Sequence, residues 1–267
     1  MEVSVPTMAE MAANGETPEV LFWVGCAGSF DQRAQRVTRS FIKILSHLKI
    51  KFAVLGSEES CTGDPAKRAG NEFVFQMLAL QNVEVLNNYG VKKIVTTCPH
   101  CFNILKNEYP SLGGNYDVIH HSTYLQSLID EGRIKLSDTS AFKGKRITYH
   151  DSCYLGRANE IYEAPRKLLE ELDAQLVEMK SCRTKGLCCG AGGAQMFKED
   201  EPGKKRINVA RTEEALEADA QVVAVACPFC NTMMTDGVKA KDKQMQVKVF
   251  DIAELLAAGQ NLETIHL

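Results

Sequence analysis

Short apolar runs alternate with longer amphipathic segments along most of this chain, which is the pattern of an α/β protein. The first run, Val20–Val24, predicts a buried strand, and Gln32–Leu48 carries apolar residues at helical spacing. The alternation continues with a strand at Phe52–Leu55, a helix at Asn71–Tyr89, a strand at Lys93–Thr97, a short helix at about Cys101–Glu108, a strand at Tyr116–Ile119 and a helix at Thr123–Glu131.

The second half repeats this order. Its predicted strands are Arg146–Tyr149, Gln175–Met179, Val222–Ala226 and Val247–Val249, and its predicted helices are Ala164–Leu172, Lys204–Ala218, one after Cys227, and Ile252–Ala257. Alternating strands and helices predict parallel sheets covered by helices. We therefore expect an α/β fold of two tandem Rossmann-like halves, residues 20–131 and 146–257, related by internal duplication. Residues 1–19 are small, polar and acidic, which predicts a disordered tail, and residues 132–145 predict a polar linker.

The cysteines fall into a pattern that occurs twice. The first copy is Cys26, Cys61-Thr62-Gly63 and Cys98-Pro99-His100-Cys101, and the second is Cys153, Cys188-Cys189-Gly190 and Cys227-Pro228-Phe229-Cys230. The second copy follows the first by 127, 127 and 129 positions at the three anchors, which indicates gene duplication with one thiol-rich site per half. Each lone cysteine and each CPxC pair lies at or just past a predicted strand end, where open α/β sheets bind their ligands.

Composition and charge narrow the possible functions. Of 267 residues, 45% are hydrophobic and 24% are charged, as in globular proteins, and 31 basic residues nearly balance 34 acidic ones, which gives no support for nucleic acid as a partner. No apolar run reaches the ~18 residues of a membrane span, and the first residues lack a secretory signal. We expect a cytoplasmic protein, in which ten cysteines indicate metal or redox chemistry rather than disulfides.

The two thiol sets predict different chemistry. The first half offers four thiols, Cys26, Cys61, Cys98 and Cys101, which suit either a cubane [4Fe-4S] cluster or a tetrahedral zinc; a single close pair favours the cluster. The second offers five, Cys153, Cys188, Cys189, Cys227 and Cys230, which predicts an unusual cluster or one thiol left free. Thr62 in place of an adjacent cysteine therefore predicts that the halves differ. A redox dithiol at CPxC is the plainer alternative, and Cys182 is interpreted as a loop or buried thiol.

Two further features have open interpretations. His150 lies three residues before Cys153, where it could hydrogen-bond a cluster sulfur or give a proton to a departing thiolate; a strand-end histidine held by the backbone is the alternative. The charged segment Lys198–Arg206 is a solvated surface or a docking patch for an electron-transfer partner.

These motifs resemble the cysteine-rich CCG domain family, over roughly Val20 to Leu256. Its members include the B subunit of heterodisulfide reductase and the iron–sulfur subunits of glycolate oxidase and glycerol-3-phosphate dehydrogenase. The resemblance implies that the five thiols of the second half hold a non-cubane [4Fe-4S] cluster that cleaves a disulfide in one-electron steps, and that the four of the first half hold a second centre. The departure at Thr62 argues against a non-cubane cluster there.

Together these observations predict an iron–sulfur oxidoreductase subunit in which Cys188, Cys189 and His150 are catalytic. The chain has no ferredoxin-like run of closely spaced cysteines, so we expect a ferredoxin-type or flavin-containing redox subunit as partner, and a small-molecule disulfide or another redox substrate. One alternative is a pure electron-relay subunit of a flavin-linked 2-hydroxy-acid dehydrogenase, which a substrate-sized pocket at Cys188-Cys189 would disfavour. The other is a zinc-binding structural or interaction module.

Overall fold

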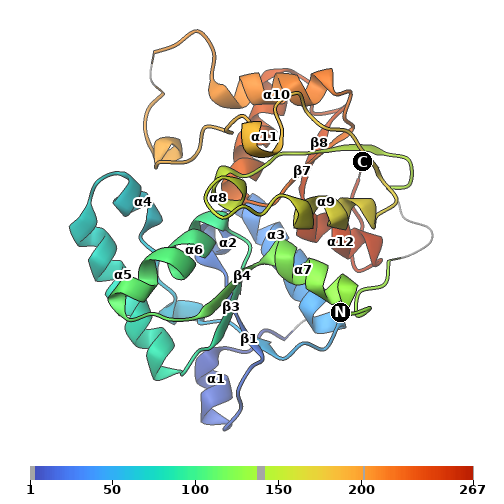
Figure 1. Ribbon diagram of the computed structural model, residues 1–267. Helices are drawn as coiled ribbons and strands as arrows, with labels where there is room; N and C mark the ends of the chain where they lie inside the picture. Colours follow the sequence, from blue (N-terminus) through green and yellow to red (C-terminus); the bar gives the residue numbers. More distant parts are fainter. Residues whose placement is uncertain (1–3, 137–141, 201, 267) are drawn as a thin grey trace. The chain divides into compact units, whose positions relative to one another are not determined.

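The computed structural model describes residues 4–136, 142–200 and 202–266 (Figure 1). The chain divides into two compact units, Met1–Tyr124 and Leu125–Leu267. Each unit contains one four-stranded parallel sheet, so the predicted α/β class with two parallel sheets is confirmed.

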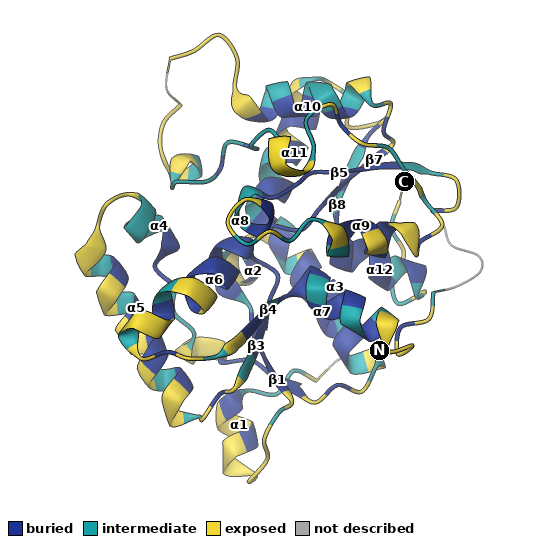
Figure 2. Cartoon of the chain, in the orientation of Figure 1, coloured by how far each residue is buried: buried dark blue, intermediate teal, exposed yellow. Residues whose placement is uncertain are grey.

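The sheet of the first unit has the order β2-β1-β3-β4. Its strands are β1 (Val20–Trp23), β2 (Phe52–Ala53), β3 (Lys93–Thr96) and β4 (Asp117–His120). The central strand β1 is a buried apolar run, and β3 is buried except at Lys93, as expected of parallel strands covered on both faces (Figure 2). The helices are α1 (Met8–Ala13), α2 (Gly25–Phe30), α3 (Gln32–His47), α4 (Asp64–Arg68), α5 (Glu72–Asn88), α6 (Pro99–Asn103) and α7 (His121–Asp130), the last of which continues into the second unit.

The sheet of the second unit repeats this topology, with the order β6-β5-β7-β8. Its strands are β5 (Arg146–Tyr149), β6 (Gln175–Leu176), β7 (Val222–Val225) and β8 (Lys248–Asp251). The helices are α8 (Cys153–Gly156), α9 (Glu163–Glu170), α10 (Ile207–Glu217), α11 (Pro228–Ala240) and α12 (Ile252–Gly259). The repeated strand order agrees with the repeated cysteine spacing, and both support an internal duplication.

The N-terminal segment differs from its prediction. Residues 4–19 are not a disordered tail, because Thr7 begins helix α1 with a capping box to Glu10 and the side chains of Met8 and Met11 are buried. The backbone of Met8 also donates to the carbonyl of Val54 at 2.8 Å, which joins the segment to the sheet region. Polar composition led to the prediction of disorder, although two apolar residues, Met8 and Met11, stand at helical spacing. Residues 1–3 lie outside the described chain.

The predicted linker is also partly packed. Ile134 and Phe142 have buried side chains, while residues 137–141 within the linker lie outside the described chain. Helices α2, α4 and α8, which have four to six residues each, were not predicted. Segments of this length are too short for apolar periodicity to identify. All three lie next to cysteine motifs and therefore shape the candidate sites.

Candidate metal centres

The five predicted thiols of the second unit lie together. Cys153 begins α8 just after β5, Cys227 precedes α11 just after β7, and the two strands are neighbours in the sheet. The sulfur atoms form a continuous chain of contacts, from Cys153 through Cys188, Cys189 and Cys230 to Cys227. The Sγ atoms of Cys189 and Cys230 are 3.5 Å apart. All five thiols are free of disulfides.

Local backbone geometry produces this convergence. Pro228 stands at the first position of α11, where a helix needs no N–H donor, so the CPxC segment turns directly from strand to helix. Gly190 adopts a left-handed backbone (φ +91°), and its N–H donates to the Cys188 sulfur at 3.2 Å. An extended chain would direct Cys188 and Cys189 to opposite sides, and this turn lets both join the set.

The crowding of the thiols shifts their pKa values apart. Contacts with Cys153 and Cys189 lower the pKa of the Cys188 thiol to about 2, whereas contact with Cys188 raises the pKa of Cys153 and of Cys189. Buried thiols in contact cannot all ionise without a compensating positive charge. A bound metal or iron–sulfur core supplies that charge, because thiolates are its ligands, so the donor set fits such a group.

The first unit assembles its four thiols in the same way. Cys26 contacts Cys61, Cys98 contacts Cys101, and the charge of Cys98 acts on Cys26. Gly63 takes the left-handed turn of Gly190 (φ +88°) and its N–H donates to the Cys61 sulfur at 3.4 Å.

Thr62 occupies the place of the missing thiol. Its hydroxyl donates to Cys101 Sγ at 3.8 Å, just as Cys189 lies against Cys230 in the second unit. The side chain is buried, so a hydroxyl fills the fifth position of the first set.

Acidic groups surround the first thiol set. The Glu59 carboxylate accepts from the N–H groups of Val24 (2.9 Å) and Gly25 (2.6 Å), directly before Cys26, and burial raises its pKa to about 7. Asp64 lies 2.9 Å from the His100 ring and 3.2 Å from the Arg68 guanidinium. Asn82 donates to the Cys61 carbonyl at 3.0 Å and so holds the middle cysteine in place.

Two fully buried arginines stand near the second thiol set instead. Arg166 makes a bidentate pair with Asp151, at 2.8 and 3.0 Å, and Asp151 in turn accepts from the Arg183 N–H at 2.7 Å. Arg211 donates to the Ser181 carbonyl at 2.6 Å. These contacts hold the segment that leads into Cys188 against β5 and α10.

His150 belongs to this site. One of its ring nitrogens, Cys189 Sγ and Cys230 Sγ lie within 4.8 Å of one another, and His150 Nδ1 accepts from Arg211 Nε at 3.0 Å. Burial, followed by the charge of Arg211, lowers the pKa of His150 to about 3. His150 therefore lies near two of the thiols, and its role toward a cluster sulfur or a departing thiolate stays a prediction. Arg166 and Arg211 were missed, since nothing in their local sequence distinguishes a buried arginine from a solvated one.

Cys182 is the tenth thiol and lies in the segment before Cys188. The charged groups that act most strongly on it are Glu178, Arg166, Asp151 and Arg211. It is only partly buried, as expected for a loop thiol.

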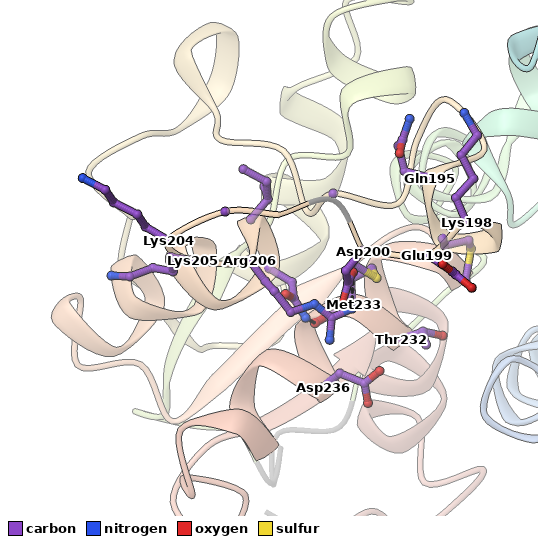
Figure 3. Close-up of a pocket in the computed structure, with 15 residues that line it drawn as sticks. Gln195, Lys198, Glu199, Asp200, Lys204, Lys205, Arg206, Thr232, Met233 and Asp236 are labelled. Carbon is purple, nitrogen blue, oxygen red and sulfur yellow. Dashed lines mark hydrogen bonds and ion pairs between the residues drawn. The ribbon is translucent and has the colours of Figure 1, made fainter.

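A cavity of about 520 Å³ opens beside Gly190 (Figure 3). Residues from the charged segment Lys198–Arg206 line it together with Met233 and Thr232 of α11. Arg206 pairs with Asp200 at 3.1 Å, whereas Lys204 and Lys205 extend away from Met233 in Figure 3. The charged segment thus borders a hollow at Gly190, which none of the cysteines lines. Within the described residues, no helix has the length and apolar character needed to cross a membrane.

Comparisons with known proteins find the same cysteine-rich domain in both units. The cysteine-rich domain CCG matches residues 20–106 and 147–235, one match per unit. A relative from Bacillus subtilis, named "Probable iron-sulfur-binding oxidoreductase FadF", is 47% identical over 96% of this chain and 36% of its own length. The EtfAB:quinone oxidoreductase of Syntrophomonas wolfei is 45% identical over 91% of this chain and 34% of its own length.

A more distant relative is a subunit of the dihydromethanophenazine:CoB–CoM heterodisulfide reductase of Methanosarcina barkeri. It is 35% identical over 92% of this chain and 60% of its own length. The chain therefore spans about a third of the first two relatives and three fifths of the third.

Proposed function

Because this chain belongs to the cysteine-rich CCG domain family, we propose that it is an iron–sulfur oxidoreductase subunit with one thiolate-bound centre in each unit. The observation that carries the proposal is the continuous contact of five free thiols at the carboxyl ends of β5 and β7. Relatives named as iron–sulfur-binding oxidoreductase and heterodisulfide reductase subunit support the same class of chemistry.

In the second unit, Cys153, Cys188, Cys189, Cys227 and Cys230 would hold a [4Fe-4S] cluster of non-cubane type. Five thiolates exceed the four of a cubane, which supports a modified cluster or one exchangeable ligand. When bound, such a group supplies one-electron steps to a disulfide or another redox substrate. His150, beside Cys189 and Cys230, would act in catalysis by donating a hydrogen bond to sulfur.

In the first unit, Cys26, Cys61, Cys98 and Cys101 would hold a cubane [4Fe-4S] cluster or a zinc. Four thiolates suit both, and Thr62 cannot replace a fifth thiolate because its hydroxyl stays protonated. We assign this centre an electron-relay or structural role.

The cavity beside Gly190 leaves both a substrate role and a pure relay open for the second unit, because none of the five thiols lines it. Its volume of about 520 Å³ is that of a small-molecule site. Electrons would come from a ferredoxin-type or flavin-containing redox subunit, or from a further part of a longer chain. The relative named EtfAB:quinone oxidoreductase makes the flavin-linked donor the first to test.

Anaerobic purification tests the proposal. We expect iron and acid-labile sulfide in near-equal amounts, with two distinguishable paramagnetic signals after partial reduction or oxidation. A colourless protein that contains zinc and no iron would instead establish the zinc-binding module. Activity of CPxC as a dithiol would survive removal of iron, whereas cluster-dependent activity is lost with it.

A further inference from the structure

A fully buried arginine fixes the orientation of the histidine beside the second thiol set. Arg211, on helix α10, donates from Nε to His150 Nδ1 at 3.0 Å. A ring nitrogen of the same histidine lies within 4.8 Å of the Cys189 and Cys230 sulfurs. His150 therefore connects a buried cation to two of the thiols.

The guanidinium itself is held by other contacts. Its Nη1 donates to the Ser181 carbonyl at 2.6 Å and to the Glu214 carboxylate at 2.5 Å. Its Nη2 is buried with no hydrogen-bond acceptor among the described residues. The contacts of Nε and Nη1 therefore fix the guanidinium against His150.

The contact decides which histidine nitrogen carries the proton. Arginine is always protonated and has only donors, so His150 Nδ1 must accept. In the neutral ring the proton then resides on Nε2. We infer that Arg211 is a positioning residue of the second centre, which holds His150 as an Nε2–H donor toward its sulfur ligands.

The first unit offers an independent parallel. The residue 127 positions before His150 is Trp23, the offset that relates Cys26 to Cys153. Trp23 is fully buried, and its indole N–H has no acceptor among the described residues. Both units thus place a ring N–H three residues before the lone cysteine. An indole nitrogen is a donor by its chemistry, whereas an imidazole needs a partner that fixes the proton.

The residue aligned with Arg211 fits this difference. Asn82 lies 129 positions before it, the offset of the CPxC pairs, and hydrogen-bonds Ser60, Cys61 and the Tyr109 hydroxyl rather than the indole of Trp23. At this aligned position, therefore, the unit with the histidine has an arginine and the unit with the tryptophan has an asparagine.

The inference rests on the proposed iron–sulfur centre of the second unit, and redox potentials test it. Hydrogen bonds to ligand sulfur stabilise the reduced state, so losing one lowers the midpoint potential. Arg211→Lys keeps the charge but loses the fixed Nε–H, and His150→Gln removes the ring. We expect each substitution to lower the potential of the second centre in the iron-loaded protein while the signal of the first stays in place.

The double variant separates positioning from general effects. If Arg211 acts through His150, Arg211→Lys causes no further fall in the His150→Gln background. Additive shifts, or an unchanged potential in Arg211→Lys at full iron content, would overturn the inference. Arg166→Lys is the matched control, because Arg166 is equally buried but pairs with Asp151 and Glu178. The change in midpoint potential caused by Arg166→Lys should be the same in the wild-type and the His150→Gln background.

A measurement on metal-free protein tests the same contact in variants that do not assemble the centre. Nitrogen-15 NMR of histidine-labelled, metal-free protein distinguishes the two tautomers, and His150→Gln identifies the resonance. We expect the Nε2–H form in the wild type and a mixture in Arg211→Lys; an Nδ1–H form in the wild type contradicts the inference. Wild-type protein that never contains iron refutes the proposed function instead, so the two failures are distinguishable.

Discussion

Single residues decide how adjacent cysteines reach one site. Gly190 and Gly63 take the same left-handed turn after the middle motif, and each donates its N–H to a cysteine sulfur two residues earlier. The sequence identified both glycines and all nine thiols, because cysteine spacing is a direct chemical signal. It did not identify Arg211 or Arg166, since the burial of a charged side chain depends on partners distant in the sequence.

Substitution of Gly190 tests the turn. A Cβ at this position would meet Ile207 Cβ at 3.2 Å and be strained at φ +91°. We expect Gly190→Ala to lower the free energy of unfolding by about 1–3 kcal/mol and to reduce the iron bound per chain. Gly193→Ala is the control, because Gly193 has φ +67° but open space around it. Equal losses of iron in both variants would show that the close approach to Ile207 is unimportant.

Removal of one thiol tests the separation of the centres. Cys189 contacts Cys188 and Cys230, so Cys189→Ala should alter or abolish the spectrum of the second centre. The signal of the first centre should remain, as its four thiols are unchanged. Cys182→Ala is the matched control, and we expect both spectra to survive it. Equal damage to both signals by Cys189→Ala would refute separate centres.

Helices and strands were predictable in proportion to their length. Long helices such as α3 and α5 and the buried strands β1, β3, β5 and β7 lie within a few residues of their predicted positions. Edge strands β2 and β6 have two residues each and are shorter than their apolar runs suggested, because a strand ends where its partner no longer pairs. Helix α1 was missed although Thr7 and Glu10 form a capping-box pattern, because polar composition outweighed that short signal.

The cap of α1 gives a test at this scale. Thr7 accepts from the Glu10 N–H at 3.2 Å, and Glu10 accepts from the Thr7 N–H at 2.8 Å. Thr7→Ala should lower the free energy of unfolding by about 1 kcal/mol, measured by urea denaturation, and speed hydrogen exchange at Met8. Glu10→Gln retains an acceptor for the reciprocal bond and should change little. Unchanged exchange in Thr7→Ala would mean that the cap does not hold this segment to Val54.

The whole molecule is a duplicated fold whose copies have diverged around a shared sulfur framework. Strand order, glycine turns and CPxC geometry are the same in both units. The surroundings differ, with Glu59 and the Asp64–Arg68 pair near the first set and His150 and the Arg211–Glu214 pair near the second. The duplication could be predicted from the cysteine spacing alone, whereas this difference in charged neighbours could be seen only in the folded structure.

Substitution of Thr62 tests which feature makes the two centres differ: the number of thiols or the charged groups around them. Its hydroxyl contacts Cys101 as Cys189 contacts Cys230, so Thr62→Cys would place a thiol in the equivalent position. We expect the paramagnetic spectrum of the first centre to move toward that of the second, while Thr62→Ser, which keeps the hydroxyl, leaves it unchanged. If Thr62→Cys also leaves it unchanged at full iron content, a fifth thiol is insufficient, because the neighbouring acidic groups disfavour another thiolate. Combining Thr62→Cys with Glu59→Gln then removes one of those charges and tests that explanation directly.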